Sequence, residues 1–125
     1  MILVDTSVWV DHLRVGDAAL VVLLDQAKVV THPFVIGEIA CGSLRQRKSV
    51  LDLLADLPAA AVADGDEVRG FIERHVLHGK GIGYVDVHLL ASVALTDGAQ
   101  LWTRDKKLQA AAQALGRAYL DSAAH

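Results

Sequence analysis

The sequence predicts an α/β protein, a three-layer sandwich in which a central, mainly parallel sheet is flanked by helices. Short apolar runs with the composition of buried strands alternate along the chain with longer segments of helical periodicity. The 125 residues suit one domain, expected over residues 1–125, and no linker, repeat or low-complexity tract interrupts them. Strands that alternate with helices form parallel sheets whose two faces are covered by the helices.

The first strand and helix follow from the opening residues. Ile2–Asp5 is a short apolar run that ends in a charge, which is typical of a buried strand. Thr6 and Ser7 offer a helix N-cap, because their hydroxyls accept hydrogen bonds from the unpaired amides of a first turn. Val8–Arg14 is therefore predicted to be a short helix that stops near Gly16.

Three more helices and a strand are expected before residue 56. Asp17 can cap a helix over about Ala18–Ala27, and the short, β-branched run Lys28–His32 predicts the second strand. A proline is favourable at a first helical position, so the next helix is expected over Pro33–Gly42. Arg47–Ala55 continues as a further helix, which stops before the next proline.

The middle of the chain is predicted to add one strand and two helices. Ala59–Val62 is a short apolar run and is expected to be the third strand. Asp64 or Asp66 can begin a helix that ends near Gly79, and the glycines that follow predict a loop. Tyr84–Thr96 is the next expected helix, because an Asp-Gly pair follows it.

The C-terminal part is predicted to complete the sheet. Gln100–Trp102 is the fourth strand, Asp105 caps a helix over Lys106–Leu115, and Gly116 closes that helix. Ala118–Leu120 is expected as a last short strand. Because ligands of open parallel sheets bind beyond the carboxyl ends of the strands, polar residues that follow the strands are the first candidates for a site.

Composition limits the classes of protein that fit. The net charge of −3 argues against a passive nucleic-acid coat, which is usually basic, but not against a nuclease. The longest apolar runs are far shorter than the ~20 residues that cross a bilayer, and no leader segment precedes Asp5. The single cysteine, Cys41, excludes an internal disulfide and a cysteine-based zinc site. We therefore expect a cytoplasmic protein without a membrane partner.

Four carboxylates are predicted to gather at one rim of the sheet. Asp5 and Asp105 follow the first and fourth strands, Asp86 lies in the first turn of a helix, and Glu38 lies in the middle of one. Taken singly, Asp5 and Asp105 could be helix caps, and Glu38 and Asp86 could be halves of buried ion pairs. All four together at one sheet edge are harder to explain in that way.

The helix faces strengthen the case for a cation. Glu38 shares its helical stripe with Phe34 and Cys41, and Asp86 shares its own with Leu89, so we expect both acids to face the core. A lone ionised carboxylate there costs several kcal/mol, and no Lys or Arg lies on either stripe. Converging acids with few bases are typical of sites for Mg²⁺ or Mn²⁺. In phosphodiester hydrolysis such ions activate a water and stabilise charge on the leaving oxygen.

Four segments around these acids resemble the motifs of PIN-domain proteins, specifically the VapC-type toxins of bacterial toxin–antitoxin pairs. They occur in the family's order along the whole chain: Val4–Trp9, His32–Ile39, Gly83–Leu90 and Leu101–Leu108. The resemblance implies a PIN-like fold and an endoribonuclease that needs Mg²⁺ or Mn²⁺. It also implies structured RNA such as tRNA or ribosomal RNA as substrate, a homodimer, and neutralisation by a VapB-type antitoxin protein.

Matching position by position, the resemblance assigns metal binding and catalysis to four carboxylates and a supporting role to two hydroxyls: Asp5, Glu38, Asp86 and Asp105, with Ser7 and Thr103. There is one departure. Many PIN domains carry another acid shortly after the fourth motif's Asp, whereas Lys106 and Lys107 stand here. We therefore expect one tight metal ion. With Arg104, these lysines are suited to hold RNA phosphate, although a solvated helix start remains an open interpretation.

Two other classes of function remain as alternatives. A PIN-like module could bind RNA or a protein without cleaving anything, although the complete acidic set argues against this. A phosphotransfer enzyme of the receiver or haloacid-dehalogenase type would use Asp5 as a nucleophile. The phosphatase pattern needs a second Asp two residues later, where this chain has Ser7, and the paired acids and later Lys of receivers are not found.

Overall fold

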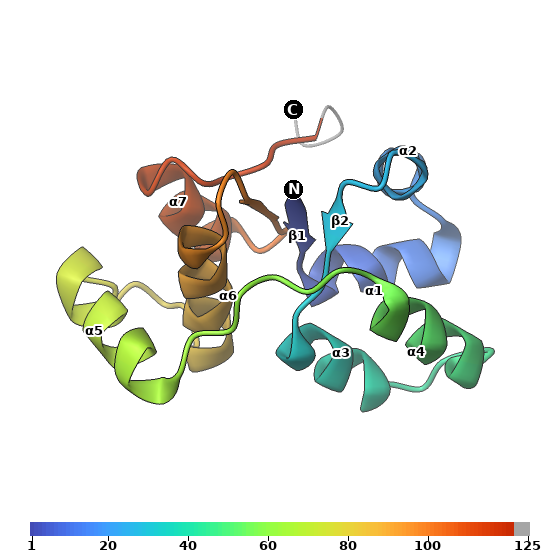
Figure 1. Cartoon of the computed structure of the whole chain (residues 1–125), viewed down its shortest axis with the longest axis horizontal. Helices are drawn as coiled ribbons and strands as arrows, with labels where there is room; N and C mark the ends of the chain where they lie inside the picture. The colour runs from blue at the N-terminus through green and yellow to red at the C-terminus, as the bar shows by residue number, and fades with distance from the viewer. Residues whose placement is uncertain (122–125) are drawn as a thin grey trace.

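A three-stranded parallel sheet lies at the centre of the computed structural model, which describes residues 1–121 (Figure 1). Its order is β2–β1–β3, so that β1 (Ile2–Val4) pairs with β2 (Val29–Val30) on one side and with β3 (Gln100–Trp102) on the other. Ile2 lies opposite both Val29 and Gln100, which brings the three carboxyl ends to one edge. The last four residues of the predicted domain, 122–125, lie outside the described range.

Two further segments touch the outer edges of this sheet. Ala59–Val62 and Ala118–Leu120, predicted as strands, each make a single parallel bridge, to Thr31 and to Leu101 respectively. The prediction of full strands was wrong, because only one residue of each segment keeps the register before the chain leaves the sheet. All pairings within the described residues are nevertheless parallel, as predicted.

Seven helices surround the sheet within residues 1–121: α1 (Thr6–Val15), α2 (Ala18–Asp25), α3 (Pro33–Ala40), α4 (Arg47–Asp56), α5 (Gly65–His75), α6 (Tyr84–Leu95) and α7 (Lys106–Ala114). In Figure 1, α5, α6 and α7 lie on one side of β1 and β2, and α1, α3 and α4 lie on the other. The predicted three-layer α/β arrangement is therefore confirmed. The part of the chain that the structure describes contains no helix long and apolar enough to span a membrane.

Local signals explain most of the helix boundaries. Asp17, Asp64 and Asp105 cap α2, α5 and α7, each accepting a hydrogen bond from a first-turn amide. The largest difference concerns α5, which ends at His75 instead of near Gly79. Its backbone turns left-handed at the following valine, with φ of 52°, and this ends the helix early.

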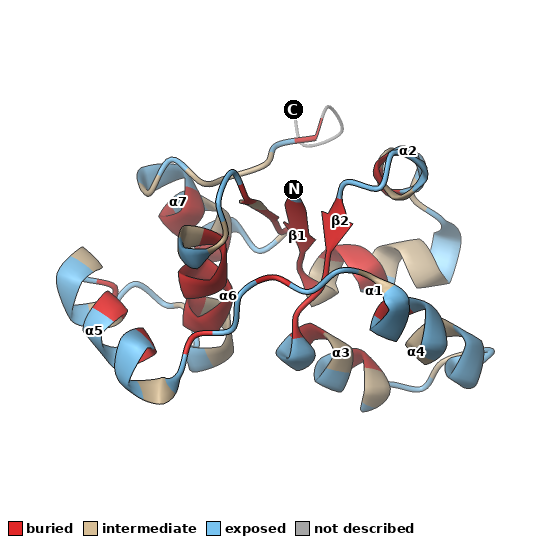
Figure 2. Ribbon diagram, in the orientation of Figure 1, coloured by how far each residue is buried: buried red, intermediate tan, exposed pale blue. Residues whose placement is uncertain are grey.

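The helix α6 is the most deeply buried of the set (Figure 2). Every residue from Val87 to Val93 is buried, including Leu89 and Leu90, which share the stripe of Asp86 as predicted. Because α6 packs against β3 and α5, it cannot shift without disturbing the core. Asp86 is thus carried on the most rigidly held helix of the fold.

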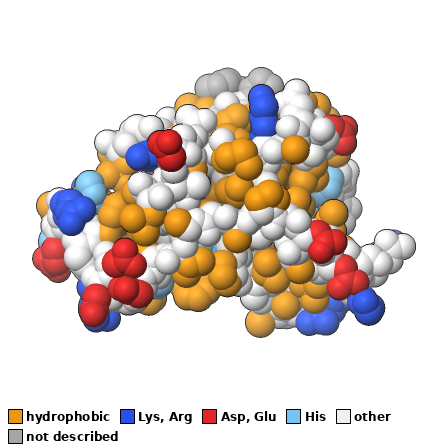
Figure 3. Space-filling view, viewed as in Figure 1, with side chains coloured by type: hydrophobic (Ala, Val, Ile, Leu, Met, Phe, Trp, Pro, Cys, Tyr) orange, Lys and Arg blue, Asp and Glu red, His pale blue; other side chains and the backbone are white. Residues whose placement is uncertain are grey.

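The outer surface is mixed in character. On the face drawn in Figure 3, charged side chains gather toward the two ends, over α5 and over α4, and apolar side chains occupy the middle. This agrees with a hydrophobic fraction of 53%, which is high for a chain of this length.

Candidate metal centre at the carboxyl ends of the strands

The four predicted acids meet at the carboxyl edge of the sheet. Asp5 follows β1, Glu38 lies on the helix after β2, Asp105 begins the helix after β3, and Asp86 is in the first turn of α6. Burial raises the pKa of Asp86, the amide of Gly83 opposes this, and the negative charges of Asp5, Asp105 and Glu38 raise it further. The other three carboxylates therefore lie close enough to Asp86 to repel its negative charge.

Each carboxylate is oriented through one of its two oxygens. Hydroxyls orient two of the acids: Asp5 Oδ2 accepts from Ser7 and Thr103, and Glu38 Oε1 accepts from Thr6. Backbone amides orient the other two: Asp86 Oδ2 accepts from Gly83, and Asp105 Oδ1 accepts from Leu108. The second oxygen of each acid has no hydrogen-bond partner among residues 1–121. A carboxylate fixed at one oxygen and open at the other suits a cation ligand.

The donor set fits a hard divalent cation. All the open atoms are carboxylate oxygens, which Mg²⁺ and Mn²⁺ prefer, and no Lys or Arg pairs with any of the four acids in the described part of the chain. Within residues 1–121 no three acidic, histidine or cysteine side chains lie close enough together to hold a metal ion by themselves. A cation would therefore use water to complete its shell, as Mg²⁺ commonly does.

Two hydroxyls fix Asp5 in place. Thr103 Oγ1 donates to Asp5 Oδ2 at 2.7 Å, and Ser7 Oγ donates to the same oxygen at 2.9 Å. Each hydroxyl also accepts a hydrogen bond from a backbone amide. The Asp105 amide donates to Thr103 Oγ1 at 3.1 Å, and the Arg104 amide donates to Ser7 Oγ at 3.1 Å. Asp5 is only 7% exposed, so these bonds replace water around much of its carboxylate. The network ties the end of β1 to the start of α7.

Thr6 is a site residue that the sequence did not reveal. Thr6 and Ser7 were predicted to cap α1, but that helix begins at Thr6 and has no side-chain cap. Their hydroxyls instead serve the acids, and Thr6 Oγ1 donates to Glu38 Oε1 at 2.8 Å. The available signal was its position, since Thr6 directly follows Asp5 at the end of a strand.

The expectation that Glu38 faces the core is wrong. Glu38 is exposed, and so are its stripe neighbours Phe34, at 38%, and Cys41. The helix α3 instead buries Val35 and Ile39, a second apolar stripe offset by one residue. Burial therefore disfavours the ionised carboxylate of Asp86 on α6 but not that of Glu38, which joins the site from its solvent side.

Arg104 lies behind the acids and is bound to other carboxylates. Its Nη1 is 2.8 Å from Asp11 Oδ2, and its Nη2 bonds Asp17 and lies 3.6 Å from Asp121. Its guanidinium also lies over the Trp102 ring, 5.6 Å from the centroid. Since both Nη atoms are engaged with carboxylates, Arg104 is less free than the neighbouring lysines for the phosphate-binding role expected of it, which stays a prediction. Its role is to join the β3–α7 turn to α1 and α2.

The two lysines that follow Asp105 are placed differently. Lys106 and Lys107 are both exposed at the start of α7. Neither forms an ion pair within the described residues, so their charges remain available to an anion.

The family model for PIN domains matches residues 2–114. This chain belongs to the PIN-domain family. Ribonuclease VapC32 of Mycobacterium tuberculosis is 57% identical to it over 111 residues, in both strain CDC 1551 / Oshkosh and strain ATCC 25618 / H37Rv. The aligned region covers 89% of this chain and 90% of each relative. The resemblance to VapC-type PIN domains, first seen in four short segments, is thus confirmed over most of the chain.

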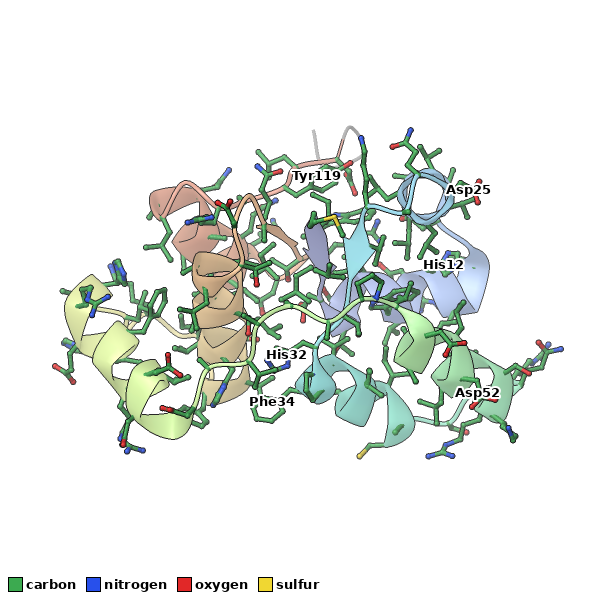
Figure 4. The ribbon with its side chains drawn as sticks, in the orientation of Figure 1. His12, Asp25, His32, Phe34, Asp52 and Tyr119 are labelled. Atoms are coloured by element: carbon green, nitrogen blue, oxygen red, sulfur yellow. The ribbon has the colours of Figure 1, made fainter. Side chains whose placement is uncertain are left out.

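Two buried histidines lie beneath the site of this PIN domain. His32 is fully buried, and its Nδ1 accepts from the Phe34 amide at 3.0 Å, capping α3. The Phe34 ring packs edge-on against both His32 and His88 (His32 and Phe34 are labelled in Figure 4). Burial is the larger cause that lowers the pKa of His32 to about 4, and the charge of the neighbouring His88 is the smaller one. Burial also lowers the pKa of His88. Both rings are therefore neutral at pH 7.

The stability of this PIN domain is expected to fall between about pH 6.5 and pH 4 because of His32. The folded state keeps this ring neutral down to a pKa of about 4, whereas the unfolded chain takes up a proton near pH 6.5. The unfolded state binds more protons in this window, so acidification favours it, by up to about 3 kcal/mol. Urea unfolding across this range should show a shallower pH slope for His32→Asn, which keeps a cap but does not titrate. Equal slopes would contradict this account.

Proposed function

We propose that this PIN domain is an endoribonuclease toxin that cleaves structured RNA, tRNA or ribosomal RNA, with the help of Mg²⁺ or Mn²⁺. The observation that carries the proposal is the convergence of three carboxylates on Asp86, which they repel, with one bonded and one open oxygen on each of the four. Their arrangement costs free energy unless a cation offsets the repulsion. A bound divalent cation supplies an activated water to attack phosphorus and neutralises charge on the leaving oxygen.

The residues divide into two pairs by burial. Asp5 and Asp86 are the better shielded from water, so we assign them as direct ligands. Glu38 and Asp105 are exposed and are assigned to bind the cation through water. Ser7 and Thr103 orient Asp5, and no side chain is required as a nucleophile. With lysines after Asp105 in place of a further acid, we propose one tight cation, not two.

The RNA and protein partners follow from the family. The Mycobacterium tuberculosis relative is a ribonuclease, which supports RNA as the substrate. Lys106 and Lys107 are proposed to contact its phosphates, because they are exposed and unpaired within the described residues. The resemblance to VapC-type toxins supports a VapB-type antitoxin, a homodimer and a cytoplasmic location.

The proposal is tested by incubating the purified protein with total RNA and Mn²⁺, beside Asp5→Ala and Asp86→Ala. Discrete cleavage products are expected from the native chain only, and a chelator should abolish them. Circular dichroism of each variant shows whether it remains folded. Equal cleavage by folded variants, or cleavage undiminished by the chelator, would refute a metal-dependent ribonuclease. Tight RNA binding without cleavage under any divalent ion would instead support a non-catalytic module.

Removal of the Thr103 hydroxyl is expected to weaken metal binding without removing a ligand. Valine has nearly the same shape as threonine, but it lacks the hydroxyl. In Thr103→Val, Asp5 therefore loses one hydrogen-bond donor, and the Asp105 amide loses its acceptor. Mn²⁺ affinity, measured by calorimetric titration, should fall by about 10- to 100-fold, as is usual when a ligand loses its orienting partner. Thr103→Ser keeps the hydroxyl and should remain near the native affinity. An unchanged affinity for the Val variant would show that the hydroxyl does not orient the site.

A further inference from the structure

A pocket with a basic rim lies between the end of α5, the loop before α6, and α7. Its volume is about 260 Å³. The floor is apolar and the rim carries two lysines and a histidine: Leu77, Ala111 and Leu115 below, with His75, Lys80 and Lys107 around them. None of the described residues that line it is acidic.

Two of the elements that line the pocket also carry acids of the proposed metal centre. Lys107 stands two residues after Asp105, and its side chain lies flat across Gly81 of the loop that leads to Asp86. A Cβ at Gly81 would lie 2.8 Å from both Cδ and Nζ of Lys107, so a larger residue would push the lysine aside, and the φ of +76° at this position favours glycine. The same loop supplies the Gly83 amide that orients Asp86. The pocket and the proposed metal centre therefore share the loop before α6 and the first turns of α7.

The charges of this pocket are not balanced from within. Neither Lys80 nor Lys107 has an ion-pair partner among residues 1–121, in contrast to Arg104. The third rim residue is an aromatic ring, since His75 packs on Phe71 with 4.5 Å between the ring centroids. Two ammonium groups and an aromatic edge over an apolar floor match a phosphate joined to a flat heterocycle. Proteins bind unstacked RNA nucleotides with this combination of side chains.

We propose that this pocket binds one unstacked nucleotide of the RNA substrate. The base lies on the apolar floor beside His75, and its phosphate lies between Lys80 and Lys107. The volume is slightly below the range of ~300–1,000 Å³ usual for drug-sized ligands, which suits a single base. This inference deepens the proposed function, because it assigns a subsite to the same substrate.

The phosphate contact is tested through the salt dependence of RNA binding. A short, fluorescein-labelled single-stranded RNA is titrated with the protein in a chelator, so that binding is measured without cleavage. Lys80→Ala and Lys107→Ala should each weaken binding and reduce the slope of log K against log salt by roughly 0.7, the value for one phosphate of a single strand. Lys28 is exposed and directly precedes β2, at the end of the sheet opposite to the acids. Lys28→Ala should leave the slope unchanged.

The base contact needs a variant that changes no charge. Ala114 is exposed and lines the pocket, so Ala114→Leu fills it and should lower affinity about 10-fold, in line with the usual worth of one stacked base, with no change in salt slope. Ala55→Leu on α4 is the matched control and should have no effect. Duplex RNA of the same sequence should not respond to Ala114→Leu.

The outcomes separate this inference from the proposed function. Absence of single-stranded RNA binding by the native chain would overturn the subsite, as would slopes for Lys80→Ala and Lys107→Ala that match the Lys28→Ala control. An equal response of duplex RNA to Ala114→Leu would also overturn it. Because these titrations contain no metal, a failure of metal-dependent cleavage refutes the proposed activity without changing them.

Discussion

Asp86→Asn is expected to abolish metal-dependent RNA cleavage and, in the same protein, to stabilise the metal-free fold. Burial and the charges of Asp5, Asp105 and Glu38 disfavour an ionised carboxylate at this position. A neutral amide relieves that repulsion and keeps the shape, but it is a poor ligand for a hard cation. Cleavage should fall by more than ~100-fold, because even the orienting partners of a ligand are worth 10- to 100-fold.

Thermal unfolding with and without Mn²⁺ measures both effects. At about 100 times the dissociation constant, Mn²⁺ should stabilise the native chain by about 2.7 kcal/mol, which raises Tm by roughly 10 °C for a domain of this size. Asp86→Asn should show a higher Tm than the native chain in chelator and almost no Mn²⁺ shift. Asp97→Asn, an exposed acid just beyond α6, is the control and should behave as the native chain does. A native-sized Mn²⁺ shift in Asp86→Asn would contradict its assignment as a ligand.

Arg104→Leu is expected to cause the largest loss of stability among surface-proximal substitutions, about 3 kcal/mol. The arginine faces Asp11, Asp17 and Asp121, and the side chains of the last two are only 15% and 3% exposed. Burial alone would raise the pKa of Asp17, but the bonds and charge of Arg104, with the Leu20 amide, reverse this and lower it. Removing one partner of such a cluster leaves buried charges uncompensated, which usually costs 3–5 kcal/mol.

Urea unfolding at pH 7 measures this loss, with Arg104→Lys as the matched control. Lysine keeps the charge but cannot reach two carboxylates with one planar group, so its loss should be about half as large. Because the cluster also fixes the turn before Asp105, the Leu variant should bind Mn²⁺ more weakly as well. A free energy of unfolding within 1 kcal/mol of the native value would show that the cluster contributes little.

Local signals in the sequence were enough for the central fold. The helices α2 and α7 begin at the predicted caps, Asp17 and Asp105, and α5 begins at Asp64, one of the two caps predicted for it, because a cap depends on residues only three positions away. The meeting of four acids could also be foreseen, since parallel strands end at a common edge. These features need no knowledge of which distant segments pack together.

The features that were not foreseen depend on tertiary packing. Two apolar stripes overlap on α3, and only the packed structure shows that Val35 and Ile39 face inward while Glu38 stays exposed. The partners of Arg104 lie up to 93 residues away in the chain, and no local pattern connects them. The Thr6 hydroxyl meets Glu38 across 32 residues in the same way.

The most direct test of the central claim is anomalous diffraction from crystals soaked in Mn²⁺. One strong Mn²⁺ peak is expected in contact with Asp5 and Asp86, with Glu38 and Asp105 within reach of its waters. The same soak of Asp86→Asn crystals should lose the peak. A peak bound by other residues, or no peak among these four acids at saturating Mn²⁺, would contradict the account.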